Sequence, residues 1–130
     1  MQVLIIDRSN FIMDRLEEII SEAGNVRLIH KAVSYDEAID LIKENKPDAV
    51  VLDSGLPSNE SVDLLKKIKK SMPDTRVIVL SIFVDSVTEK RYKSLGADFF
   101  FDKYHEFGKI PAIINGLSKN HKTRDVNADK

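Results

Sequence analysis

Short apolar runs alternate with segments of helical period along this chain of 130 residues. The runs are Val3–Ile6, Val26–Ala32, Ala49–Leu52, Val77–Leu80 and Phe99–Phe101. They are rich in Val, Ile and Phe, which is typical of strands covered by helices on both faces of a parallel sheet. Five strands and five helices in strict alternation predict an α/β fold, with a (βα)5 doubly wound parallel sheet.

Helix signals separate these runs. The apolar positions from Ile12 to Ala23 recur at helical spacing, and Gly24 is expected to end that helix. Ser34-Tyr35-Asp36-Glu37 reads as a capping box at the start of the second helix, and Pro47 follows its end. A third helix carries an apolar stripe between Val62 and Ile68. Each helix is therefore expected to be short and to pack on the sheet.

The C-terminal third continues the pattern. Asp85 or Ser86 is expected to cap a fourth helix that ends at Leu95-Gly96. A fifth helix is expected to begin between Glu106 and Pro111, with the proline in its first turn, and to end near Gly116 or Leu117. We therefore predict one domain over residues 1–117 and a polar, flexible C-terminal tail over 118–130.

Composition excludes several classes of function. Lys plus Arg number 20 and Asp plus Glu 21, so the net charge of -1 gives no field for nucleic acid or an anionic membrane. The lysines of the third helix, from Lys66 to Lys70, are expected to form its solvated face. With no cysteine and no apolar run of membrane-spanning length, we expect a cytoplasmic protein without disulfides.

Four polar side chains are expected at one edge of the sheet. Asp7 and Asp53 end the first and third strands, Ser81 ends the fourth, and Lys103 follows the fifth. Open α/β sheets place their chemistry at the carboxyl ends of the strands. Aspartate can carry a phosphoryl group, which a hydroxyl and an ammonium can hold by hydrogen bonds. The alternative is that each Asp merely caps the next helix or turn.

The chain resembles the receiver domains of two-component response regulators, as a single, stand-alone domain. The matching pieces are Val3-Leu4-Ile5-Ile6-Asp7, Asp53-x-x-Leu56-Pro57, Val77-Ile78-Val79-Leu80-Ser81 and Gly96-Ala97-Asp98…Lys103. Each is weak alone, but together, in order and at receiver spacing, they are specific. The resemblance implies a flavodoxin-like sheet with strand order 2-1-3-4-5.

The resemblance also implies roles for these positions in a phosphorelay. Asp53 would accept a phosphoryl group from a histidine kinase or phosphotransfer protein. Asp7, Asp53 and the carbonyl oxygen of Gly55 would hold Mg2+. Ser81 would be the switch hydroxyl, and Lys103 would contact the phosphoryl group. The domain would then be a signalling phosphoacceptor rather than an enzyme.

An output surface follows from the same resemblance. Phe100 occupies the place of the aromatic switch residue, although an ordinary core aromatic is an equal alternative. A downstream protein would bind the face of the fourth helix, fifth strand and fifth helix, around Val87, Tyr92 and Phe100. Homodimerisation, and onward transfer of the phosphoryl group, remain open.

Arg8 departs from the receiver pattern, which has two adjacent acids after the first strand. The change replaces a metal ligand by a positive charge and is expected to weaken Mg2+ binding. At about 4 Å and an effective dielectric of 20, two unit charges interact by roughly 4 kcal/mol. Arg8 could swing to solvent, pair with Asp53 in place of the cation, or simply point outward at the start of the helix.

Two more departures concern the loops. Tyr104 stands where receivers commonly carry proline, often with a cis bond, so the loop after Lys103 is expected to be trans at that bond or reshaped. Gly55 and Phe83 occupy the two positions that tune hydrolysis of the aspartyl-phosphate in receivers. Because Phe83 offers no hydrogen bond to water, autodephosphorylation is expected to be slow.

The sequence is compatible with three functions. The first is the phosphorylated response regulator. The second is a phosphorylation-independent pseudo-receiver that binds partners with Arg8 in the metal site. The third is a small-ligand protein such as a flavodoxin, although Arg8-Ser9-Asn10-Phe11 has little of the hydroxyl-rich character that a flavin phosphate needs.

Overall fold

A computed structural model of the chain describes residues 1–117. Its five strands are β1 (Gln2–Ile6), β2 (Leu28–Ala32), β3 (Ala49–Asp53), β4 (Arg76–Ser81) and β5 (Phe99–Asp102). All pair in parallel, in the order β2-β1-β3-β4-β5. The predicted fold class and strand order are confirmed. The second strand is shorter than expected and begins at Leu28 rather than Val26.

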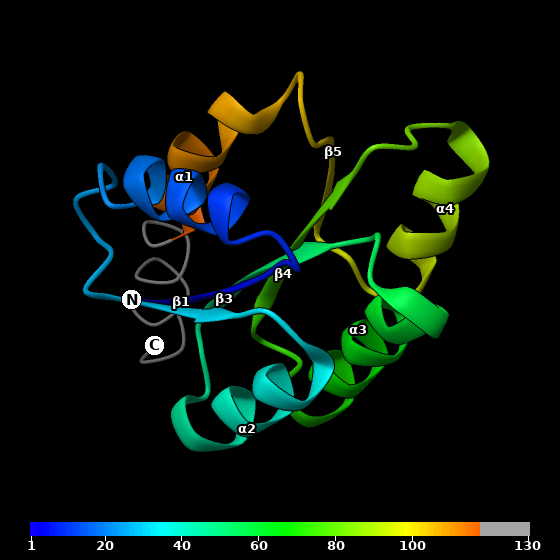
Figure 1. The fold of residues 1–130 in the computed structure, drawn as a ribbon, viewed down its shortest axis with the longest axis horizontal. Helices are drawn as coiled ribbons and strands as arrows, with labels where there is room; N and C mark the ends of the chain where they lie inside the picture. Colours follow the sequence, from blue (N-terminus) through cyan, green and yellow to red (C-terminus); the bar gives the residue numbers. More distant parts are fainter. Residues whose placement is uncertain (118–130) are drawn as a thin grey trace, which may run out of the picture.

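Helices cover both faces of this sheet (Figure 1). They are α1 (Asn10–Ile20), α2 (Tyr35–Asn45), α3 (Glu60–Ser71), α4 (Ser86–Ser94) and a helix over 110–117, with short 3-10 turns η1 (Pro57–Asn59) and η2 (Phe107–Lys109). In Figure 1, α1 and the helix over 110–117 lie on one side of the sheet, and α2 and α3 lie on the other. The expected 118–130 tail lies outside the described residues.

The predicted helix starts are confirmed more closely than the ends. Ser34 accepts a hydrogen bond from the Glu37 backbone N–H, and Asp85 accepts one from the Thr88 N–H. The Glu37 carboxylate, however, accepts from the Val33 N–H, one residue before the expected partner. The prediction that Gly24 ends the first helix was wrong: α1 ends at Ile20, and residues 21–25 form turns.

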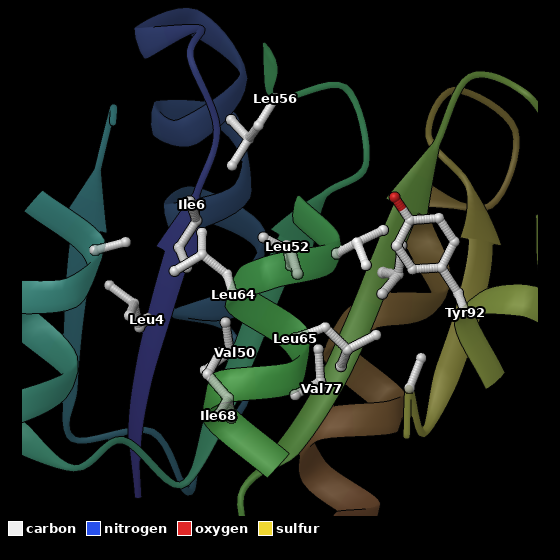
Figure 2. Packing of buried hydrophobic residues seen from close by; sticks show 14 of the residues in the cluster. Leu4, Ile6, Val50, Leu52, Leu56, Leu64, Leu65, Ile68, Val77 and Tyr92 are labelled. Carbon is white, nitrogen blue, oxygen red and sulfur yellow. The ribbon is translucent and has the colours of Figure 1, made fainter. Parts of the chain in front are cut away.

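The strands bury alternate side chains on opposite faces. In β1, Leu4 and Ile6 pack toward α2 and α3, whereas Val3 and Ile5 pack toward α1. Figure 2 shows the first of these clusters, in which the labelled side chains are Leu4, Ile6, Val50, Leu52, Leu56, Leu64, Leu65, Ile68, Val77 and Tyr92. Each fully buried Leu or Ile stabilises the fold by about 1.5–3 kcal/mol relative to exposure. The sheet is therefore a rigid support for its carboxyl edge.

The expectation that the lysines of the third helix form its solvated face was wrong for Lys69. Its ammonium lies 2.7 Å from Asp98 Oδ2 and donates to the carbonyl of Thr75 at 2.7 Å. Asp98 also accepts from the Val77 N–H. Gly96, at φ +110°, approaches this lysine so closely that a Cβ there would lie 2.8 Å from Lys69 Cγ. This ion pair therefore joins α3 to the segment before β5.

No helix among residues 1–117 is long and apolar enough to cross a membrane.

Candidate functional site

The strand ends bring three predicted site residues into contact. Asp7 follows β1, Asp53 closes β3, and Lys103 follows β5. The Lys103 ammonium lies 2.8 Å from Asp7 Oδ2 and 3.2 Å from Asp53 Oδ1. All three residues are buried. Their contact excludes the simple alternative in which each Asp does no more than cap a local turn.

Backbone pairing positions Lys103. Its N–H donates to the carbonyl of Ser81 at 2.9 Å, next to the Ser81–Asp102 register pair of β4 and β5. Asp102 accepts from the N–H groups of Tyr104 and His105, which turns the chain after the lysine. The Lys103–Tyr104 bond is trans, as expected. The side chain is thus aimed along the edge toward β1 and β3.

The charges in this cluster shift two pKa values. Burial, and then the negative charge of Asp7, raise the pKa of Asp53, while the Lys103 ammonium and the Gly55 N–H oppose that rise. Burial of the ammonium acts to lower the pKa of Lys103, but Asp7 and Asp53 outweigh it and raise that pKa. Lys103 therefore stays charged at neutral pH, and Asp53 is a carboxylate held at a cost in free energy.

Local hydrogen bonds hold the two carboxylates in place. Asp7 Oδ1 accepts from the Ser9 N–H at 2.8 Å, and Ser9 Oγ caps α1 by accepting from the Ile12 N–H. The buried Ser61 hydroxyl donates to the Asp53 carbonyl at 2.7 Å and accepts from the Leu56 N–H at 3.3 Å. The first and third strand ends are thus each tied to the helix that follows.

Ser81 lies on the same edge, but its hydroxyl does not contact the carboxylates. Ser81 Oγ donates to the Phe83 carbonyl at 2.9 Å and accepts from the Phe83 N–H at 3.1 Å. Phe83 is 70% exposed. In this conformation the predicted switch hydroxyl is bound to its own loop, and it must rotate to reach a group on Asp53.

Arg8 lies at the edge of the same site. An open pocket of about 390 Å³ is lined by Asp7, Arg8, Ser9, Asp53, Gly55, Ile82, Lys103 and Tyr104. Arg8 is exposed, and within residues 1–117 its guanidinium makes no ion pair. The expected alternative of a direct pair with Asp53 is therefore not formed here.

The oxygen atoms of the site are of the kind that bind a divalent cation, but Arg8 and Lys103 add two positive charges to the same pocket. Although Asp7 Oδ2 touches the Lys103 ammonium, it is buried and has no hydrogen-bond partner of good geometry among the described residues. A Cβ at Gly55 would lie 3.2 Å from Asp53 Oδ2, so glycine keeps the space beside that carboxylate open. Carboxylate and carbonyl oxygens are ligands that suit Mg2+. No group of three or more acidic or histidine side chains able to hold a metal occurs within the described chain.

The expected output residues differ in exposure. Val87, at the start of α4, is 77% exposed, whereas Tyr92 and Phe100 are buried. The Tyr92 and Phe100 rings pack against each other with centroids 5.8 Å apart. Of the three, only Val87 can touch a partner directly in this conformation.

Sequence reasoning missed Ser61 and Ser9. Neither lies at a strand end. Ser9 had one available signal, since a serine before a helical stripe is a common N-cap. Ser61 had none, because its bond spans the loop from Asp53 and depends on how α3 approaches β3.

Comparison with known proteins agrees with this geometry. The sequence matches the family described as response regulator receiver domain over residues 3–115. The chemotaxis protein CheY of Thermotoga maritima is 30% identical over 118 residues, which cover 91% of this chain and 98% of that protein. A methylesterase/glutaminase of Methanospirillum hungatei is 31% identical over 127 residues, which cover 96% of this chain but only 36% of that protein. Most of the methylesterase thus lies outside the match.

Two solved structures share the fold. The response regulator domain of Thermotoga maritima CheB has a TM-score of 0.76 at 27% identity, covering 92% of this chain and 94% of that one. The receiver domain of the Francisella response regulator 1452 has a TM-score of 0.82 at 25% identity, covering 92% and 98%. In both cases the likeness covers most of this chain.

Proposed function

Because the chain belongs to the family of response regulator receiver domains, we propose that Asp53 accepts a phosphoryl group from a phosphohistidine. The donor would be a histidine kinase or a phosphotransfer protein. The observation that carries the proposal is the Lys103 ammonium held between Asp7 and Asp53 beside an open pocket. This arrangement supports the proposal, because the proposed nucleophile and a cation lie together beside a space that a phosphoryl group could enter.

The transfer itself requires little covalent chemistry from the protein. An Asp53 carboxylate oxygen attacks phosphorus, the P–N bond to the donor imidazole breaks, and its electron pair stays on the imidazole nitrogen. Positioning and charge stabilisation supply the catalysis. Lys103 lies 3.2 Å from Asp53 Oδ1 and can bind the new phosphoryl oxygens. Where Mg2+ binds, Asp7, Asp53 and the Gly55 carbonyl oxygen would hold it, against the added positive charge of Arg8 in the same pocket.

The signal would pass through Ser81. Once phosphoryl oxygens compete for its hydroxyl, the two bonds to Phe83 break, and the loop before α4 is released. The buried Tyr92–Phe100 pair lies between α4 and β5, so movement of that loop is transmitted to the face that carries Val87. Such a switch needs two packings of similar energy that the phosphoryl group biases.

Amide NMR spectra test the proposal. Beryllofluoride with Mg2+ stands in for the phosphoryl group. We expect shifts at Asp53, Ser81 and Lys103 that spread to Phe100, and none in Asp53→Ala. A spectrum unchanged by saturating beryllofluoride and Mg2+ would instead favour a phosphorylation-independent binding domain.

A further inference from the structure

Arg8 makes the pocket beside Asp53 electrically neutral in formal charge. Four of the side chains that line it are charged at neutral pH. They are two carboxylates, Asp7 and Asp53, and two cations, Arg8 and Lys103. Their formal charges cancel. A divalent cation entering this pocket would leave it with an excess of two positive charges, before any phosphoryl group arrives. A dianionic phosphoryl group, in contrast, would enter a pocket that already holds two positively charged side chains.

The residues on both sides of Arg8 form hydrogen bonds that hold its backbone at the rim of the pocket. The preceding Asp7 accepts from the Ser9 N–H, and Ser9 in turn caps α1. The guanidinium is exposed and is not engaged by an ion pair within residues 1–117. It is therefore tethered beside Asp53 and able to change rotamer toward a ligand.

A second hollow offers Arg8 another position. This hollow, of about 250 Å³, is lined by Arg8, Val33, Ser34, Tyr35, Asp36, Leu56, Pro57 and Glu60. Neither the Asp36 nor the Glu60 carboxylate pairs with Arg8 within 4.0 Å in the described structure. No ion pair of the described residues therefore has to break for the guanidinium to turn toward a stronger anion. A phosphoryl group, with more charge and three oxygens, is that stronger anion.

We propose that Arg8 is a phosphoryl-binding residue, which together with Lys103 holds the group transferred to Asp53 and makes the transfer largely independent of divalent metal. The inference rests on the proposed function of Asp53. Guanidinium binds phosphate oxygens in a bidentate manner, which a metal-bound water shell does not reproduce. Because Arg8 is exposed and forms no ion pair within residues 1–117, its substitution should leave the fold intact.

Phosphoramidate tests the inference without a kinase. An Asp53 oxygen attacks phosphorus, the P–N bond breaks, and the already protonated nitrogen leaves as ammonia. Intact-protein mass spectrometry follows the aspartyl-phosphate in Mg2+ and in EDTA. For the wild-type protein we expect similar rates in both. Arg8→Gln should slow the metal-free reaction about tenfold or more, which corresponds to about 1.4 kcal/mol of transition-state stabilisation.

Arg8→Asp supplies the opposite charge, and Arg15→Gln is the matched control. Arg15 is an exposed arginine of α1 that does not line the pocket. Arg8→Asp should react only with Mg2+. It should also bind Mg2+ about tenfold more tightly or better than the wild type, as measured by amide shifts at Asp7, Asp53 and Gly55 in an NMR titration without any donor. Arg15→Gln should behave as the wild type in both assays.

The outcomes separate this inference from the proposed function. Wild-type phosphorylation that requires Mg2+ would overturn the role of Arg8 and leave Asp53 as the phosphoacceptor. Arg8→Gln reacting in EDTA as fast as the wild type would overturn it as well. Absence of aspartyl-phosphate under both conditions would remove the proposed function, and the role of Arg8 with it.

Discussion

The Lys103 ammonium lies 2.8 Å from Asp7 Oδ2, joining the end of β1 to the loop after β5 across the sheet. The same ammonium is 3.2 Å from Asp53 Oδ1 on β3. One cation thus compensates two buried carboxylates from distant parts of the chain. The stability of this edge and its chemistry depend on the same three residues.

Removal of that cation should destabilise the protein. Lys103→Met leaves Asp7 and Asp53 buried without their shared partner, so we expect a loss of about 3 kcal/mol in the free energy of unfolding. Urea denaturation at pH 7 measures it. Lys109→Met is the control, because that lysine pairs with Glu106 at the surface, and its loss should be below about 1 kcal/mol. Equal losses in the two variants would contradict the central role of Lys103.

Asp53 should be a destabilising charge at neutral pH. Asp53→Asn removes the buried charge and its repulsion with Asp7 while Lys103 keeps Asp7 as a partner, so we expect a gain of about 1 kcal/mol. The pKa of Asp53 is raised in the folded protein, so protonation of this carboxyl stabilises the fold. That stabilisation is fully present at pH values below the pKa of the unfolded state, and it is lost as the pH rises through the pKa of the folded state.

The advantage of Asp53→Asn should therefore shrink on acidification. Thermal unfolding from pH 7 downward measures the difference between the variant and the wild type. Asp40→Asn, at an exposed position of α2, should stay within about 0.5 kcal/mol of the wild type at each pH. An advantage that grew toward acid pH would show that the pKa of Asp53 is lowered in the fold.

The Ser61 hydroxyl should stabilise the loop after β3. Ser61→Ala leaves the Asp53 carbonyl and the Leu56 N–H without their buried partner, at an expected cost of about 1–3 kcal/mol. Hydrogen exchange of the Leu56 amide should quicken as the loop loosens. Ser71→Ala, which removes an exposed bond to the Lys67 carbonyl, should change stability by less than about 0.5 kcal/mol. Unaltered exchange at Leu56 would argue against this function of Ser61.

Gly96 should tolerate no side chain. Gly96→Ala places a Cβ at φ +110° and 2.8 Å from Lys69 Cγ, so we expect a loss of about 1–3 kcal/mol and disruption of the Lys69–Asp98 pair. Gly116→Ala is the opposite control. Nothing lies within 4 Å of the Cβ that this change would add, and alanine stabilises a helix by about 0.5–1 kcal/mol relative to glycine. Differential scanning calorimetry should show melting temperatures that move in opposite directions.

Phe83 should slow loss of the phosphoryl group, if Asp53 carries one. The phenyl ring gives the hydrolytic water no hydrogen bond, so the aspartyl-phosphate should be long-lived, and Phe83→Gln should shorten its lifetime several-fold. Phe83→Leu, which stays apolar, should leave the lifetime unchanged. Decay is followed by intact mass after removal of the donor. Rapid decay of the wild type would contradict the prediction.

The sequence by itself determined the fold class and which strand-end residues lie at the site. The pattern of apolar runs predicts strands that end at or next to Asp7, Asp53, Ser81 and Lys103. Parallel pairing then brings the carboxyl ends of the strands to one edge of the sheet, independently of the details of packing. Caps such as Ser34 and Asp85 were also predictable, because their bonds reach only three residues along the chain.

Only the tertiary structure decided where side chains point at that edge. The Lys103–Asp53 bond spans 50 residues of sequence, and no local pattern reports it. The Ser81 hydroxyl turned to its own loop, and Tyr92 turned from an expected surface into the core. Rotamers at a strand end depend on the neighbouring elements that pack there, and the free-energy differences between them are small beside the burial that determines the fold.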